Sequence, residues 1–346
     1  MDDMDLAVLP PVDPMLAKAA TLVPDDPDVW SYEPKWDGFR ALVFRDGDQV
    51  MLQSRNGRDL GRYFPELIAA LRTEAAPRCV LDGEIVVPRR IGGRTRLDWE
   101  SLSQRIHPAA SRVAMLAEQT PAHFIGFDAL ATGSASLLSA PFRARREALA
   151  ELVDGRRHCH VTRATGDPGL ATRWLTTFEG AGLDGVIAKR LAGCYLPGKR
   201  DMVKVKHHRD ADCVAMGYRI HKSGAGVGSI LLGLYRDDGD LAMVGGAASF
   251  TAADRLKRLA ELEPLRLAGD VVYQGEPSRW NSAADKQWIP IRPERVAEVA
   301  YDQMEGLRFR HTVKFLRWRP DRDPASCTFD QLDVPLTYDL SDVLES

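Results

Sequence analysis

The sequence has few of the features that mark secreted or membrane proteins. Its 346 residues include five cysteines, an odd number without a Cys-x-x-Cys pair, which predicts reduced thiols rather than a disulfide framework. No apolar run reaches the roughly 18 residues that a membrane-spanning helix needs. The acidic N-terminus does not resemble a signal peptide, and no internal repeat is evident. We therefore expect a cytoplasmic protein with no membrane partner.

The net charge of −3 conceals an uneven distribution. Residues 1–33 carry eight acids and one lysine, and residues 323–346 carry six acids and no base, so the intervening body has a net charge of +10. A basic body is compatible with a phosphate-binding surface, although solvated charge is the commoner explanation of such values. A chain of this length has room for two domains, each with its own core.

Residues 33–40, Glu-Pro-Lys-Trp-Asp-Gly-Phe-Arg, are the segment on which the functional interpretation depends. Lys35 lies between two acids and precedes a glycine and a strand-like apolar run at 41–44. A lysine amine attacks only after it has lost its proton, and an unperturbed pKa of about 10.4 makes the neutral form rare at pH 7. Burial and neighbouring cations, here Arg40, Arg55 or a bound metal, would favour the neutral amine. Taken alone, such a segment is more often an ordinary ion pair at a strand edge.

Polar side chains follow or interrupt two further predicted strands. The strand at 49–54 leads into an Arg-Asn-Gly turn, which places Arg55 at a strand end, where a side chain can reach into a cleft. The apolar strand at 79–87 is interrupted by Asp-Gly-Glu. Carboxylates within an apolar strand are costly unless they are paired or ligated, so Glu84 is a candidate for binding a metal or a ribose.

Other predicted elements carry an aromatic residue and a pair of lysines. Phe127 lies in a strand at 123–130, where an aromatic side chain is usually part of the core. Lys204 and Lys206 alternate along a strand, which places both ammonium groups on one face, an arrangement suited to a triphosphate. Helical periodicity is found at 63–74, 98–106, 142–153 and 168–180.

Short strand patterns dominate after residue 208, where we place a domain boundary. One predicted helix, at 251–263, accompanies these strands, which lie at 213–220, 229–235, 241–247, 295–303 and 309–318. About five strands with one helix fit an OB-fold barrel.

Residues 35–40 match the Lys-x-Asp-Gly-x-Arg signature of the covalent nucleotidyltransferases: ATP-dependent DNA ligases, RNA ligases and mRNA capping enzymes. Further segments resemble the motifs of this family in the expected order, at 54–57, 82–84, 127–128, 184–189, 204–206 and 317–322. Residues 14–17, Pro-Met-Leu-Ala, resemble the start of the catalytic domain in bacterial repair ligases. The chain is most similar to minimal, mycobacterial-like ATP-dependent DNA ligases of the ligase C type.

This resemblance implies a role for each residue of the site. Lys35 would attack ATP and carry AMP as lysyl-AMP. Contacts with the nucleotide or the nick are implied for Glu33, Arg40, Arg55, Glu84, Phe127, Lys189, Arg200, Lys204, Lys206, Arg319 and Asp321. Binding of Mg²⁺ or Mn²⁺ is implied for Asp37, Glu84 and Asp184.

The sequence departs from the family pattern at three positions. Asp184 replaces the glutamate of the fourth motif, which keeps a hard oxygen ligand but shortens it by one methylene. Met202 stands where the fifth motif usually has a tryptophan, so stacking is lost there. Arg322 replaces the lysine of the sixth motif and retains its charge but not its point-charge geometry.

The resemblance also implies the architecture and the partners. We expect an α+β protein with an N-terminal nucleotidyltransferase domain of ATP-grasp-like antiparallel sheets and helices at 1–208, a C-terminal OB-fold domain at 209–322, and an acidic tail at 323–346. The expected activity is sealing of 5′-phosphate/3′-hydroxyl nicks in DNA repair. Expected partners are nicked or broken duplex DNA and a Ku-type end-binding protein or other repair factors, for a monomer associated with a bacterial nucleoid. The alternatives are a capping-type guanylyltransferase and a non-catalytic nucleic-acid-binding module.

Overall fold

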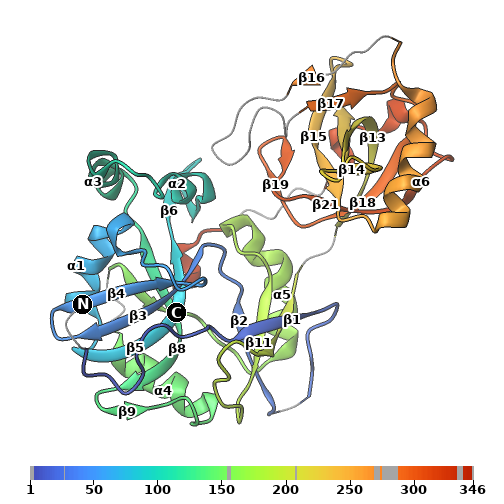
Figure 1. Cartoon of the computed structure of the whole chain (residues 1–346). Helices are drawn as coiled ribbons and strands as arrows, with labels where there is room; N and C mark the ends of the chain where they lie inside the picture. Colours follow the sequence, from blue (N-terminus) through green and yellow to red (C-terminus); the bar gives the residue numbers. More distant parts are fainter. Residues whose placement is uncertain are drawn as a thin grey trace. The chain divides into compact units, whose positions relative to one another are not determined.

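The structure is a computed structural model that describes residues 4–26, 28–153, 157–206, 209–268, 273–274, 287–332 and 338–344. The chain divides into two units (Figure 1). Unit 1 comprises Met1–His207 and Pro335–Ser346, and unit 2 comprises His208–Val334. Unit 2 therefore extends beyond the expected end at residue 322. Among the described residues, no helix combines the length and the apolar composition needed to cross a membrane.

The larger sheet of unit 1 has the strand order β10-β8-β5-β3-β4, with β9 paired to β8. Its strands are β3 (Phe39–Asp46), β4 (Gln49–Ser54), β5 (Arg78–Val86), β8 (His123–Thr132), β9 (Ala135–Ser136) and β10 (Cys159–Val161). The predicted strand at 49–54 agrees with β4. One face of the sheet packs against α1 (Pro65–Glu74), which follows η1 (Gly61–Tyr63), and α4 (Phe142–Leu152) also lies against β8. Leu81, Phe124 and Leu149 lie in the resulting core and are fully buried.

The smaller sheet of unit 1 has the order β1-β12-β11-β2. It consists of β1 (Leu16–Ala20), β2 (Trp30–Pro34), β11 (Val186–Arg190) and β12 (Arg200–Val205), with β1 and β12 parallel and the other pairs antiparallel. A separate core joins it to α5 (Pro168–Thr177) and η2 (Phe178–Ala181), and this core includes Trp174 and Val186. Because β2 ends immediately before Lys35, this sheet sets the position of the lysine backbone.

The C-terminal residues correct one prediction. The expected tail at 323–346 is divided between the units, because 335–346 belong to unit 1. Leu340 immediately precedes α7 (Ser341–Leu344), and Val343 lies within it. Both side chains are buried in the core that contains Trp174. The Leu340 amide also donates to the carbonyl of Thr95 at 2.9 Å. Composition indicated an acidic tail because this segment has six acids and no base, and composition does not show which of its apolar side chains a core buries.

A helical and hairpin region completes unit 1. It contains β6 (Pro88–Ile91), β7 (Arg94–Leu97), α2 (Trp99–Gln104) and α3 (Ala110–Gln119). Asp98 caps α2 by accepting a hydrogen bond from the Ser101 amide. The strands β6 and β7 pair only with one another among the described strands.

Unit 2 closes five strands into a ring, in the order β13-β14-β15-β21-β18 and back to β13. These strands are β13 (Arg209–Ile220), β14 (Val227–Tyr235), β15 (Leu241–Ala248), β18 (Val296–Tyr301) and β21 (Val313–Trp318). Only β15 and β21 pair in parallel. This closed ring with one helix, α6 (Ala252–Leu262), is the expected OB-fold. The remaining short elements are η3 (Glu263–Leu265), β16 (Tyr273–Gln274), β17 (Gln287–Pro290), β19 (Met304–Glu305), β20 (Arg308–Phe309), η5 (Pro324–Ser326) and η6 (Phe329–Gln331).

Candidate active site

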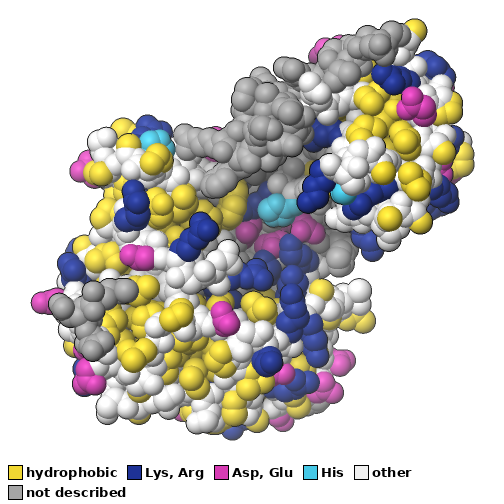
Figure 2. All heavy atoms as spheres, viewed as in Figure 1, with side chains coloured by type: hydrophobic (Ala, Val, Ile, Leu, Met, Phe, Trp, Pro, Cys, Tyr) yellow, Lys and Arg dark blue, Asp and Glu magenta, His cyan; other side chains and the backbone are white. Residues whose placement is uncertain are grey.

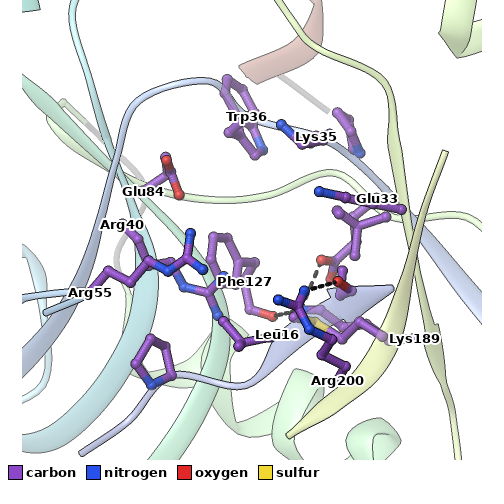
Figure 3. A pocket seen from close by; sticks show the side chains of 16 residues that line it. Leu16, Glu33, Lys35, Trp36, Arg40, Arg55, Glu84, Phe127, Lys189 and Arg200 are labelled. Atoms are coloured by element: carbon purple, nitrogen blue, oxygen red, sulfur yellow. Dashed lines mark hydrogen bonds and ion pairs between the residues drawn. The ribbon is translucent and has the colours of Figure 1, made fainter. Parts of the chain in front are cut away.

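A pocket of about 220 Å³ lies in unit 1, where the two sheets meet (Figure 3). Strands β1, β2, β11 and β12 supply one wall, and β3, β5 and β8 supply the other. Nine of the residues predicted from the sequence line it: Glu33, Lys35, Arg40, Arg55, Glu84, Phe127, Lys189, Arg200 and Lys204. In Figure 2, Lys and Arg side chains gather beside carboxylates on the visible face of unit 1.

Lys35 forms an ion pair with Asp184, a residue 149 positions later in the chain. Its Nζ donates to Oδ2 of Asp184, and the same oxygen lies 3.1 Å from Nζ of Lys206. The backbones are joined as well, because the Lys35 amide donates to the Gly185 carbonyl at 2.8 Å and the Asp184 amide donates to the Lys35 carbonyl at 2.9 Å. Burial raises the pKa of Asp184, but the two ammonium groups outweigh burial and hold this pKa below its usual value.

The backbone next to Lys35 requires glycines. Gly185 has a φ of +126°, and a Cβ placed there would lie 2.2 Å from the Val205 carbonyl oxygen. A Cβ on Gly38 would lie 2.0 Å from the Ile85 carbonyl oxygen. Side chains at these two positions would push apart the backbone segments that place Lys35, Asp184 and Glu84.

Two cations lie close to the Phe127 ring. The Arg40 guanidinium is 4.5 Å from its ring centroid, and Nζ of Lys189 is 4.8 Å from it. Lys189 is buried, donates to the Phe127 carbonyl at 2.6 Å and forms an ion pair with Oε2 of Glu33 at 2.9 Å. Burial raises the pKa of Glu33 against the opposing effect of Lys189. Its Oε1 is buried, lies 3.6 Å from Nη1 of Arg146 and accepts no hydrogen bond within the described residues, so it retains the capacity to accept one from a bound molecule.

Asp82 holds the guanidinium of Arg40 in place. Its Nε and Nη2 donate to the two carboxylate oxygens at 2.6 Å each, in the bidentate geometry that arginine and carboxylate favour. Asp82 is fully buried, and the pair holds the pKa of Arg40 well above its ordinary value despite burial. Asp82 was not among the predicted site residues. Its position two residues before Glu84, within the same apolar strand, is the signal that marks it, because a buried carboxylate requires a partner.

The three predicted metal ligands do not converge. Within the described residues there is no group of three His, Cys, Asp or Glu side chains able to hold a metal. Glu84 accepts a hydrogen bond from the Gly38 amide at 3.2 Å, and burial, against the effect of Arg40, raises its pKa to about 7. The negative charge of Asp37 also raises the pKa of Glu84. Mg²⁺ commonly binds one or two carboxylates together with phosphates and water, so separate carboxylates fit it better than a protein cage would.

Strand β12 presents its alternate side chains to the pocket. Arg200, Met202 and Lys204 all line it, whereas Val203 and Val205 are buried in the sheet core. Burial and the neighbouring lysines lower the pKa of Lys204. Lys206, which was predicted to share this face with Lys204, follows the end of β12, and its Nζ pairs with Asp184. Met202 occupies the wall at the position of the missing tryptophan.

Arg319 and Asp321 lie in unit 2, outside this pocket. The Arg319 guanidinium donates to Asp321 and to Asp212, at 2.9 and 3.1 Å, and lies 3.6 Å from Glu298. The hydrogen bond from Arg319 holds the pKa of Asp321 at about 2. Together these residues form a charged cluster on the OB-fold.

The fold and the pocket define a class of protein. A nucleotidyltransferase unit with a lysine in its pocket, followed by an OB-fold unit, is the architecture of the covalent nucleotidyltransferases. Residues 14–206 match the ATP dependent DNA ligase domain, and residues 223–322 match the ATP dependent DNA ligase C terminal region. The chain belongs to the family of ATP-dependent DNA ligases.

Individual relatives agree with this assignment. The chain is 78% identical over 347 aligned positions to DNA ligase C1 of Mycolicibacterium smegmatis, covering 99% of both chains. It is 32% identical to the multifunctional non-homologous end joining protein LigD of Mycobacterium bovis, covering 90% of this chain and 39% of the relative. A solved structure of a Lig E DNA ligase has a TM-score of 0.56 at 16% identity, covering 88% of this chain and 98% of the other, which is a likeness of fold alone.

Proposed function

We propose that this ligase seals nicks with a 5′-phosphate and a 3′-hydroxyl through a lysyl-AMP formed on Lys35. The amine attacks the α-phosphorus of ATP, a P–N bond forms, and pyrophosphate leaves. AMP then passes to the 5′-phosphate of the nick. The 3′-hydroxyl finally attacks that phosphate, and AMP leaves. The observation that carries this proposal is the position of Lys35, which lines a pocket that also contains an aromatic ring and several cations.

The described residues divide into groups by what they can bind. Phe127 offers a ring for stacking on the adenine, and Oε1 of Glu33, which accepts no hydrogen bond within the described residues, can accept an amino group. Arg40, Arg55 and Glu84 lie on the same side of the pocket as Phe127 and are assigned to the ribose and the nick (Figure 3). Arg200, Lys204 and Lys206 are assigned to phosphate oxygens, where fixed cations stabilise the charge that develops in each step.

Asp184 is assigned to positioning the Lys35 amine. The ion pair with Asp184 holds the Lys35 side chain at the edge of the pocket, where the amine can meet the α-phosphorus of a bound ATP. We assign Glu84, Asp184 and Asp37 to Mg²⁺ or Mn²⁺ shared with the phosphates. A metal bound there would supply positive charge beside the phosphate oxygens. Arg319 and Asp321 are assigned to the pyrophosphate during self-adenylation.

The experiment is incubation with α-labelled ATP or GTP and a divalent metal, followed by denaturing electrophoresis and a nicked-duplex sealing assay, for the wild type and Lys35→Ala. We expect label from ATP only, lost in the variant, together with sealing. Label from GTP would indicate a guanylyltransferase instead. Binding of duplex without any label would indicate a non-catalytic binding module.

A role in DNA repair is supported by the name of the LigD relative, which specifies non-homologous end joining. We propose on this basis that broken ends are substrates as well as nicks, and that a Ku-type end-binding protein is a partner at the nucleoid. Comparing sealing of cohesive ends with and without purified Ku tests the partnership. A Ku protein that leaves end joining unchanged would contradict it.

A further inference from the structure

The hairpin of β6 and β7 carries four arginines, Arg89, Arg90, Arg94 and Arg96, which we call the arginine ribbon. All four side chains are exposed. The register places Arg89 directly opposite Arg96 and Ile91 opposite Arg94, so Arg89, Arg94 and Arg96 share one face. Like charges directly opposite one another destabilise a strand pair. An anion bound on this face would make the same arrangement favourable.

The charge of this face is only partly neutralised by the protein. Arg89 forms an ion pair with Asp98, with Nη1 3.1 Å from Oδ2. Arg94 and Arg96 have no acidic partner among the residues that the structure describes. Residues two apart in a strand are separated by roughly 7 Å, a length over which duplex DNA presents about four phosphate charges. Two arginines at this spacing can therefore contact a phosphate backbone without reading its sequence.

The ribbon is attached to the active site at its base. The strand β6 begins two residues after the end of β5, the strand that carries Glu84. Leu97, the last residue of β7, packs against Gly182, where a Cβ would lie 2.9 Å from the Leu97 Cβ. Gly182 is two residues before Asp184, the partner of Lys35. The ribbon is therefore connected at its base to the segments that carry Glu84 and Asp184.

The other face and edge of the hairpin are held by the C-terminal residues. The Thr95 amide donates to Oδ2 of Asp339 at 3.3 Å, and the Thr95 carbonyl accepts from the Leu340 amide at 2.9 Å. Leu340 is fully buried in the core of unit 1. An isolated two-stranded hairpin is marginally stable, so these contacts give the ribbon the support that a binding element requires.

We propose that the arginine ribbon binds the phosphate backbone of duplex DNA next to the nick. This inference rests on the proposed ligase function and adds to it a contact surface outside the nucleotide pocket. Arginine suits this role because its planar guanidinium can donate two hydrogen bonds to one phosphate. The contact would position the duplex without contributing to self-adenylation.

The test uses the full chain with Arg94 and Arg96 both replaced by Gln. Affinity for a nicked duplex is measured against salt concentration, and label from ATP is measured in parallel. We expect weaker binding, a log–log salt slope smaller in magnitude by about 2, because each phosphate contact contributes about 0.9, and unchanged labelling. The variant Arg94→Lys with Arg96→Lys should retain most of the affinity and serves as the folding control.

A matched control removes the same charge elsewhere, with Arg72→Gln on α1 and Arg143→Gln on α4, both exposed. An equal loss of affinity in this control, or a wild-type slope in the ribbon variant, would overturn the proposal. Failure of the proposed function is a separate outcome, because the wild type itself would then neither take label nor seal nicks.

Discussion

The hydroxyl of Tyr195 donates a 2.6 Å hydrogen bond to Oδ2 of Asp82, the carboxylate that also holds Arg40. The Tyr195 oxygen accepts a hydrogen bond from the Met15 amide at 2.9 Å, and Arg40 donates to the Met15 carbonyl at 3.2 Å. The four residues close a ring of hydrogen bonds between segments that are far apart in the sequence. Burial and the charge of Asp82 raise the pKa of Tyr195, so its hydroxyl stays a donor.

Replacing Tyr195 with Phe should loosen Arg40 and weaken ATP binding. The change removes one hydrogen bond to a buried carboxylate and leaves the Met15 amide without its acceptor, a loss of about 1–3 kcal/mol. We expect the ATP concentration for half-maximal labelling of Lys35 to rise about tenfold or more, while sealing of a pre-adenylated nick changes less. Equal losses in both assays would instead indicate a general structural role. Leu196→Ala, at an exposed neighbouring position, is the control.

Asp184→Asn should slow self-adenylation and destabilise unit 1. The variant leaves Lys35 and Lys206 beside one another without their shared counter-charge, at a cost of about 2 kcal/mol for a largely buried pair. Because the pKa of Asp184 is lowered in the fold, its stabilisation is fully present above the unfolded value, near 3.8, and is lost as the pH falls through the folded value. Thermal unfolding should therefore separate the variant from the wild type at pH 7 and bring them together at strongly acidic pH.

The pH dependence of labelling should report Glu84. Burial raises its pKa from 4.5 to about 7, so Glu84 takes up a proton in the folded state as the pH falls below 7. Its contribution to stability decreases as the pH rises from 4.5 to 7, because the folded state holds more protons than the unfolded state in this range. In the role that we propose for it, Glu84 binds the metal as a carboxylate, so we expect labelling to rise through pH 7. In Glu84→Gln the rise near pH 7 should be absent, and its persistence would assign the titration to another group.

Leu340→Ala should lower the stability of unit 1, although the residue follows the whole of unit 2 in the chain. A fully buried leucine contributes about 2–5 kcal/mol relative to alanine. We expect a lower midpoint for the thermal transition of unit 1, detected with the tryptophans of its core. The matched control is Leu256→Ala in unit 2, where the side chain is 58% exposed. A wild-type transition in Leu340→Ala would show that residues 338–344 do not support unit 1.

Much of the fold follows from local patterns in the sequence. The alternation of β4, β12 and the OB-fold strands, the periodicity of α4 and the asparagine–glycine turn after β4 depend on neighbouring residues, and backbone geometry alone translates them into strands, helices and turns. The order of the motifs indicated the class of protein for the same reason. A motif is recognised from the residue types at neighbouring positions, which requires no knowledge of the tertiary structure.

Tertiary structure alone decided which of these residues meet. Lys35 and Asp184 are 149 positions apart, and Tyr195 and Asp82 are 113 apart. No periodicity specifies such pairs, because they depend on how two sheets pack and on which backbones approach closely enough to require Gly185 and Gly38. The return of residues 338–344 to unit 1 is of the same kind. The segment has no periodicity that marks Leu340 and Val343 as core residues, and their burial depends on a core built from distant parts of the chain.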